Sequence, residues 1–148
     1  MNDGLRFYGR LDYILYDEDG NIKDCGYVKN NVQDLLLTGV IDALDTGTFP
    51  TAQPGWMAIG TGDAAGSASS NLMSKVSNEA LTSQTQPTSV SLANVATFTG
   101  VNATIQEAGL FNVAACTSGM LLYNHALNVV MTSADSLQIT WTLSVASA

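Results

Sequence analysis

LQITWTLSV, residues 137–145, is the stretch of this 148-residue chain that decides its fold class. Large apolar side chains occupy every odd position, and polar side chains occupy every even one. Successive side chains of an extended strand point to opposite faces, so this period of two places the apolar groups on one face. The stretch therefore predicts a β-strand with one buried and one polar face, which would anchor a sandwich. The apolar positions are Leu137, Ile139, Trp141, Leu143 and Val145.

The first thirty residues repeat this alternation. Apolar residues recur at odd positions within residues 5–15, and an Asp-Gly pair at residues 19–20 precedes the segment 22–29. Two such segments joined by an Asp-Gly turn are typical of a β-hairpin, so we predict a hairpin ribbon over residues 1–30. We also expect the ribbon to be separable, so that deletion of residues 1–29 leaves a folded module.

One amphipathic helix is predicted after the ribbon, in residues 31–46. Asn31 is a residue type that caps helix N-termini, and Asp34 places an acid in the first turn. Apolar residues then recur at spacings of three and four, which places them on one face of a helix. Gly47 and Pro50 are helix breakers and predict where the helix ends. The apolar positions are Val32, Leu35, Leu36, Val40, Ile41 and Leu44.

Residues 56–148 predict the core of a β-sandwich. Residues 56–60 form a short apolar run, and further short apolar runs follow beyond residue 90, separated by turn residues. The stretch 61–78 is rich in Gly, Ala and Ser, and we interpret it as a long loop that reaches a partner, a contact arm. The prediction is a single mainly β domain, residues 1–148. It is an antiparallel β-sandwich or jelly-roll-like fold with an N-terminal hairpin and one amphipathic helix.

Charge limits the partners that this chain can bind. The net charge is −8, and charged residues make up 12% of the chain, about half the usual fraction for soluble domains. An acidic chain repels phosphates, so we expect no nucleic acid partner. The N-terminus lacks the pattern of a secretion signal, and no apolar run approaches the roughly 18 residues that span a bilayer. We therefore expect no membrane partner either.

Few residues are suited to catalysis. His125 is the only histidine, so a small hydrolase would have to combine it with a nucleophile such as Cys116. His125 lies in phase with apolar neighbours, which favours a buried or interface imidazole, and Cys25 and Cys116 are both interpreted as small core residues. Glu107 has no second carboxylate near it in the sequence and is interpreted as a buried or interfacial hydrogen-bonding acid. We expect that the protein is not an enzyme, with the hydrolase as the third alternative.

Two segments resemble ligand-binding motifs without matching them. The acidic residues between Asp17 and Asp24 have the oxygen spacing of a calcium loop, but their glycine and final acid are misplaced. Gly60, Gly62 and Gly66 imitate a phosphate-binding loop, yet no lysine follows directly and no amphipathic helix begins there. Turns account for both segments, so we expect no metal and no cofactor.

Several blocks of the sequence, taken in order, resemble a broad family of small tailed-bacteriophage virion proteins. The blocks are Lys29 to Asn31, Met57 to Gly62, Asn78 to Ala80, Ile105 to Asn112, Gly119 to Leu121 and Ser133 to Leu143. The resemblance implies a β-rich subunit of a virus particle, as a head decoration, tail or fibre component, without known catalysis or cofactor. Similar proteins often carry a basic residue and an aromatic after Gly119, where this chain has Asn124, His125 and Leu127. This departure puts any carried-over contact at that strand in doubt.

The resemblance and the negative charge together favour a position on the outside of a bacteriophage head, because an acidic subunit is a poor lining for packaged DNA. We expect a virion protein that decorates the capsid and stabilises it, with a tail, baseplate or fibre subunit as the alternative. The expected partners are the major capsid protein or other virion proteins, together with copies of the chain itself in a symmetric oligomer such as a trimer.

The predicted assembly contacts lie in the N-terminal ribbon and in the Gly-rich arm. They are Arg6, Tyr8, Arg10, Lys23, Lys29, Asp63, Asn71 and Lys75.

Overall fold

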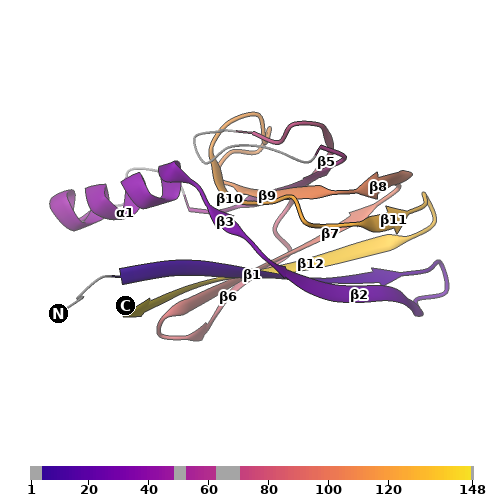
Figure 1. Ribbon diagram of the computed structural model, residues 1–148, viewed down its shortest axis with the longest axis horizontal. Coiled ribbons are helices and arrows are strands. Elements are labelled where there is room, and N and C mark those ends of the chain that lie inside the picture. The colour runs from indigo at the N-terminus through magenta and orange to yellow at the C-terminus, as the bar shows by residue number, and fades with distance from the viewer. Residues whose placement is uncertain (1–4, 49–52, 63–70, 148) are drawn as a thin grey trace.

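Two antiparallel β-sheets face each other, with one helix at one end of the molecule (Figure 1). The computed structural model describes residues 5–48, 53–62 and 71–147. The predicted fold class, mainly β and sandwich-like with one helix, is confirmed.

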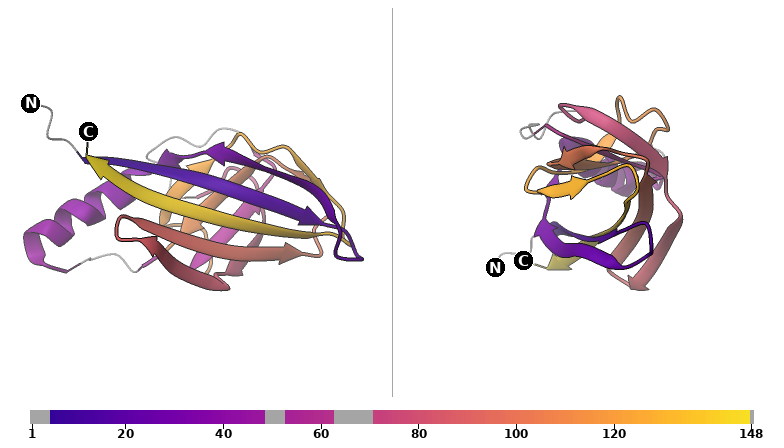
Figure 2. Two further views of the ribbon diagram at one scale, coloured as in Figure 1. Left: turned by 90° about the horizontal axis from the view of Figure 1, so that it is seen from below. Right: turned by 90° about the vertical axis from the view of Figure 1, so that its right-hand side faces the viewer.

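The first sheet contains the two longest strands of the described chain. Its order is β2 (Ile22–Lys29), β1 (Leu5–Tyr16), β12 (Ser136–Ser147), β7 (Ser91–Thr99) and β6 (Ser83–Thr88). β1 and β12 pair antiparallel along their whole lengths, from Leu5 opposite Ser147 to Tyr16 opposite Ser136. Figure 2 shows these two strands side by side, with both marked ends of the chain at the end where the helix lies.

The second sheet is built from shorter strands. Its order is β3 (Asn31–Val32), β10 (Met120–Asn124), β9 (Glu107–Phe111), β4 (Trp56–Gly60) and β5 (Lys75–Ala80). Two further short strands, β8 (Ala103–Ile105) and β11 (Val129–Met131), pair with each other.

The main hydrophobic core lies between the two sheets. The first sheet contributes Leu11, Phe98 and Trp141, and the second contributes Ile59 and Leu110 among others. On β12 the alternation predicted from the sequence is confirmed, because Leu137, Ile139 and Trp141 are buried. Burial of each such side chain contributes about 1.5 to 3 kcal/mol. Toward the end of β12 the apolar residues are only partly buried, because the shorter second sheet does not reach that end (Figure 1).

A smaller apolar cluster lies on the other face of the second sheet. Neighbouring residues of one strand alternate between the two clusters: Leu122 belongs to the main core, whereas Tyr123 belongs to the smaller cluster. The smaller cluster also contains Leu72 and Cys116, which lie outside the strands. Both faces of β9 and β10 are therefore covered, which explains why every residue of these two strands is buried.

The helix α1 (Asp34–Thr46) begins later than residues 31–46 predicted. Asn31 belongs to β3, opposite Tyr123, so the cap position falls to Gln33, which makes no side-chain capping hydrogen bond. The end of the helix is as predicted, because Gly47 adopts the left-handed conformation, with φ of 71°.

Two further expectations are wrong. Residues 5–29 do form the β1–β2 hairpin, but the hairpin is an integral part of the first sheet, because β1 lies between β2 and β12 and places Leu11 and Leu15 in the core. The stretch 61–78 is not a continuous loop, because its last residues belong to β5 and Leu72 is buried.

Candidate interaction surfaces

Four of the predicted contact residues gather on the outer face of the β1–β2 hairpin. Alternation along β1 places Arg6, Tyr8 and Arg10 on one face. Lys29 on β2 is the direct partner of Arg10 in the register, so its side chain shares that face. Tyr27, two residues before Lys29, completes the group. We call Arg6, Tyr8, Arg10, Tyr27 and Lys29 the basic patch.

The side chain of Arg10 organises the basic patch. Its guanidinium donates hydrogen bonds to the carboxylate of Asp12, at 2.8 to 3.1 Å, and lies 4.0 Å from the centre of the Tyr27 ring. The hydrogen bonds from Arg10 to Asp12 raise the pKa of the guanidinium above its ordinary value. Tyr8 and Tyr27 are both more than half exposed, and with Lys29 they line a hollow of about 490 Å³. The patch thus combines positive charge with exposed aromatic surface.

Lys23 does not join the basic patch. Its ammonium group forms a 2.8 Å ion pair with the buried carboxylate of Asp135, in the turn between β11 and β12. The hydrogen bond from Lys23, with a second from the Thr132 backbone, lowers the pKa of Asp135. Lys23 therefore fastens the hairpin to the rest of the fold within the same chain.

The predicted contacts in the Gly-rich arm are not brought together as one surface. Lys75 donates a 2.6 Å hydrogen bond to the carbonyl of Ala115, and nearby Asn78 donates to the carbonyl of Ala114. These bonds hold the loop between β9 and β10. Asn71 is exposed, and Asp63 lies outside the described residues.

The apolar face of α1 is only partly covered by the rest of the chain. Leu36 is buried in the core, whereas Ile41 is 64% and Leu44 is 74% exposed. Leu37, Ile41 and Leu44 are spaced four and three residues apart, so they form one exposed row along the helix. We call these three residues the helix stripe. A row of large apolar side chains in water is typical of a surface that another protein covers.

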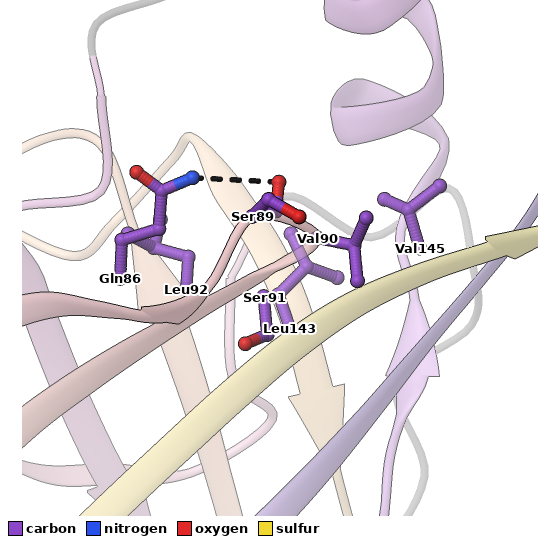
Figure 3. Close-up of a pocket in the computed structure, with 7 residues that line it drawn as sticks. All are labelled: Gln86, Ser89, Val90, Ser91, Leu92, Leu143 and Val145. Atoms are coloured by element: carbon purple, nitrogen blue, oxygen red, sulfur yellow. Dashed lines mark hydrogen bonds between the residues drawn. The ribbon is translucent and has the colours of Figure 1, made fainter.

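Two uncharged hollows continue this apolar surface onto the ends of the long strands. One, of about 370 Å³, lies between α1 and the first sheet, where Leu36 and Val40 face Phe7, Leu92 and Leu143. The other, of about 410 Å³, is shown in Figure 3. It is lined by Gln86, Ser89, Val90, Ser91, Leu92, Leu143 and Val145. Leu92 and Leu143 line both hollows, and among the described residues neither lining contains an ionisable side chain, so the arrangement suits contact with an apolar partner.

Glu107 is the buried carboxylate that the sequence predicted, and the structure gives it a defined role. Its two oxygens accept hydrogen bonds from the backbone N–H groups of Gly62, Met73 and Ser74, at 2.7 to 3.2 Å. The hydroxyl of Tyr123 donates a further bond at 3.3 Å. Glu107 therefore joins both described sides of the arm to the second sheet. Contacts within the chain account for the burial of Glu107, so no interface with another protein is needed to explain it.

Cys116 and His125 have separate surroundings. Cys116 is buried, its thiol donates to the carbonyl of Val113, and desolvation raises its pKa to about 11, so the reactive thiolate is rare at neutral pH. His125 is exposed and stacks on Tyr123, with ring centres 5.7 Å apart, so the buried alternative for this imidazole is wrong. Cys25, predicted in the core, is also exposed, because it lies on the edge strand β2.

The acidic segment after β1 is a turn. Asp17 accepts hydrogen bonds from the backbone N–H groups of Asp19 and Asn21, and Gly20 has a φ of 82°. Within residues 5–48, 53–62 and 71–147, no group of three or more His, Cys, Asp or Glu side chains is arranged to hold a metal ion. Likewise, none of the described helical residues forms a helix long and apolar enough to cross a membrane.

The sequence interpretation missed two parts of these surfaces. Tyr27 was absent from the predicted contacts, although the hairpin register places it beside Asp12 and Arg10. The exposure of the helix stripe was also missed, because the spacing of apolar residues shows that they share a face but not what covers that face. Comparisons with known proteins return no matching family model, curated protein or solved structure.

Proposed function

We propose that this chain is a structural subunit of a bacteriophage particle, and that it acts by binding other virion proteins. The observation that carries the proposal is the uncovered apolar surface formed by the helix stripe and the two adjoining hollows. A surface of this kind, without ionisable groups in its hollows, fits binding to protein better than it fits catalysis. The resemblance of the sequence blocks to small virion proteins supports the same class.

Within the particle, the first candidate is a decoration protein on the outside of the head. The net charge of −8 supports this position, because the DNA inside the head would repel the subunit. A decoration subunit binds the assembled shell in preference to its separated parts, and so it stabilises the shell by mass action. The partners would be the major capsid protein and further copies of this chain, with a trimer as the favoured oligomer.

A tail, baseplate or fibre subunit is the second candidate. The observation that favours it is the exposed pair Tyr8 and Tyr27 beside the hollow of the basic patch, since exposed aromatic rings are frequent in surfaces that recognise other molecules. In this alternative the basic patch would face a host receptor such as a glycan.

Immunogold labelling of native particles, with an antibody raised against the purified chain, tests the proposal. Labelling spread over the heads supports decoration, and labelling confined to one end of the particle supports the tail alternative. Particles that lack the chain should also lose DNA at a lower temperature if it decorates the head. Absence of label from every part of the particle, with a positive control on the denatured chain, would contradict a virion role.

A further inference from the structure

The helix stripe leaves an acidic amphipathic helix without a partner in its own chain. Within one copy, α1 contacts β10 through its buried side, while Leu37, Ile41 and Leu44 stay exposed. The same helix carries Asp34, Asp42 and Asp45 and no basic residue. Asp34 lies three residues before Leu37, and Asp45 lies four residues after Ile41, so helical spacing places these two acids beside the stripe, and whatever covers the stripe also meets two negative charges.

The basic patch is the described surface of this chain whose chemistry complements that helix. Of the five basic residues, Lys23 is paired with Asp135 and Lys75 is bound to a backbone carbonyl. Arg6, Arg10 and Lys29 share the patch, and within the described residues the side chains of Arg6 and Lys29 form no ion pair or hydrogen bond. Two exposed aromatic rings, Tyr8 and Tyr27, stand beside these cations.

We propose that α1 of one copy of this chain binds the basic patch of a second copy. In this contact the helix stripe packs on Tyr8 and Tyr27, and Asp34 and Asp45 of α1 lie near Arg6 and Lys29. The inference rests on the proposed function, because it names a second copy of the subunit as the partner of one assembly surface.

Charge is the reason to choose a second copy over another occupant. The chain carries thirteen acidic and five basic residues, so a contact between two arbitrary surfaces of this chain would bring negative charges together. The pairing of α1 with the basic patch is the arrangement that brings opposite charges together instead. Each copy has one helix and one patch, so the contact can close into a ring such as a trimer.

The test measures self-association of the full chain by sedimentation velocity. Ile41→Ser with Leu44→Ser should raise the dissociation constant by at least about tenfold, because it removes exposed apolar anchors without touching the core. Ile22→Ser with Val130→Ser is the matched control, since both side chains are more than 60% exposed and neither belongs to the helix stripe, to the basic patch or to the linings of the hollows. The control should leave the dissociation constant unchanged. Thermal unfolding of every variant checks that each one is folded.

A charge exchange tests the pairing itself. Asp34→Lys with Asp45→Lys, and separately Arg6→Glu with Lys29→Glu, should each weaken self-association by about tenfold or more. A lysine at position 34 meets the positive end of the helix dipole, so circular dichroism of the helix variant checks that α1 is kept. The chain that carries all four substitutions should associate again, because the opposite charges then meet with their positions exchanged.

Three results would overturn the inference. If the wild-type chain stays monomeric, the helix stripe does not bind a second copy, and its partner would be another virion protein. Loss of association on changing the stripe but not the patch would indicate contact between helices. Failure of the exchanged chain to associate, with each variant folded, would show that the charges do not meet. None of these results bears on the immunogold test, so the inference and the proposed function can fail separately.

Discussion

Glu107 holds the Gly-rich arm on both of its described sides, at Gly62 and at Met73 and Ser74. It is buried, and three backbone N–H groups and one tyrosine hydroxyl donate to its two oxygens. A carboxylate is acceptor-only, which matches a site surrounded by donors.

Replacement of Glu107 by Gln tests this role. The amide would place an NH₂ group against backbone N–H donors, so we expect the free energy of unfolding to fall by about 1 to 3 kcal/mol, as measured by urea denaturation. Glu79→Gln is the control, because it removes a carboxylate on β5 whose side chain makes no hydrogen bond or ion pair among the described residues. It should change stability by less than about 0.5 kcal/mol. Equal effects of the two substitutions would contradict the role given to Glu107.

The ion pair between Lys23 and Asp135 predicts a dependence of stability on pH. The pKa of Asp135 is lowered in the folded chain, so its carboxylate stabilises the fold above the ordinary value of 3.8, and this contribution is lost as the pH falls through the lower folded value. Asp135→Asn should therefore be less stable than the wild type at neutral pH, and the difference should shrink below pH 3.8. Thermal unfolding across this range measures it. Asp24→Asn, at an exposed carboxylate on β2, is the control for the loss of one negative charge.

At the scale of the element, α1 ends where a left-handed residue is required. Gly47 has a φ of 71°, its N–H donates to the carbonyl of Ala43, and an added Cβ would meet no atom within 4 Å. The cost of a side chain there is therefore backbone strain alone.

Gly47→Ala should lower the free energy of unfolding by about 1 to 2 kcal/mol, which is the cost of the left-handed conformation for an L-residue. Gly55→Ala is the matched control, because Gly55 has no positive φ and an added Cβ would make only an ordinary contact. Chemical denaturation followed by circular dichroism compares the two. A loss as large in Gly55→Ala would show that strain is not the cause.

The elements differ in how far their sequences predicted them. β12 was predicted because its alternation is local and one of its faces is buried from Leu137 to Trp141. The start of α1 was predicted wrongly, because Asn31 pairs with Tyr123 on β10 and therefore does not cap the helix. The Glu107 network was also beyond prediction, since its donors lie 16 to 45 residues away and meet it only through the fold.

At the scale of the whole molecule, the two ends of the described chain pair with each other inside the first sheet. β1 and β12 lie side by side, and their pairing joins residues more than one hundred positions apart. Such pairing cannot be derived from local patterns, which is why the hairpin was expected to be separable from the sandwich.

Deletion of residues 1–29 should therefore abolish cooperative unfolding, because it exposes the edge of β12 and removes Leu11 and Leu15 from the core. A circular permutant provides the contrast. It joins residue 147 to residue 5 by a short linker and opens the turn at residues 17–21, so that every strand is kept. The permutant should fold, with a thermal transition near that of the wild type. A cooperative transition in the deletion variant would contradict the central place of β1.

The shared location of Leu5 and Ser147 also has a practical meaning for imaging. Both lie at the end of the molecule where α1 projects, so a fluorescent protein fused to either terminus would crowd the helix stripe (Figure 1). The Asp17–Asn21 turn lies at the opposite end, where its exposed tip can carry an inserted label. A label at this internal site would leave the helix stripe uncovered, so a labelled chain can be used in the immunogold and self-association tests.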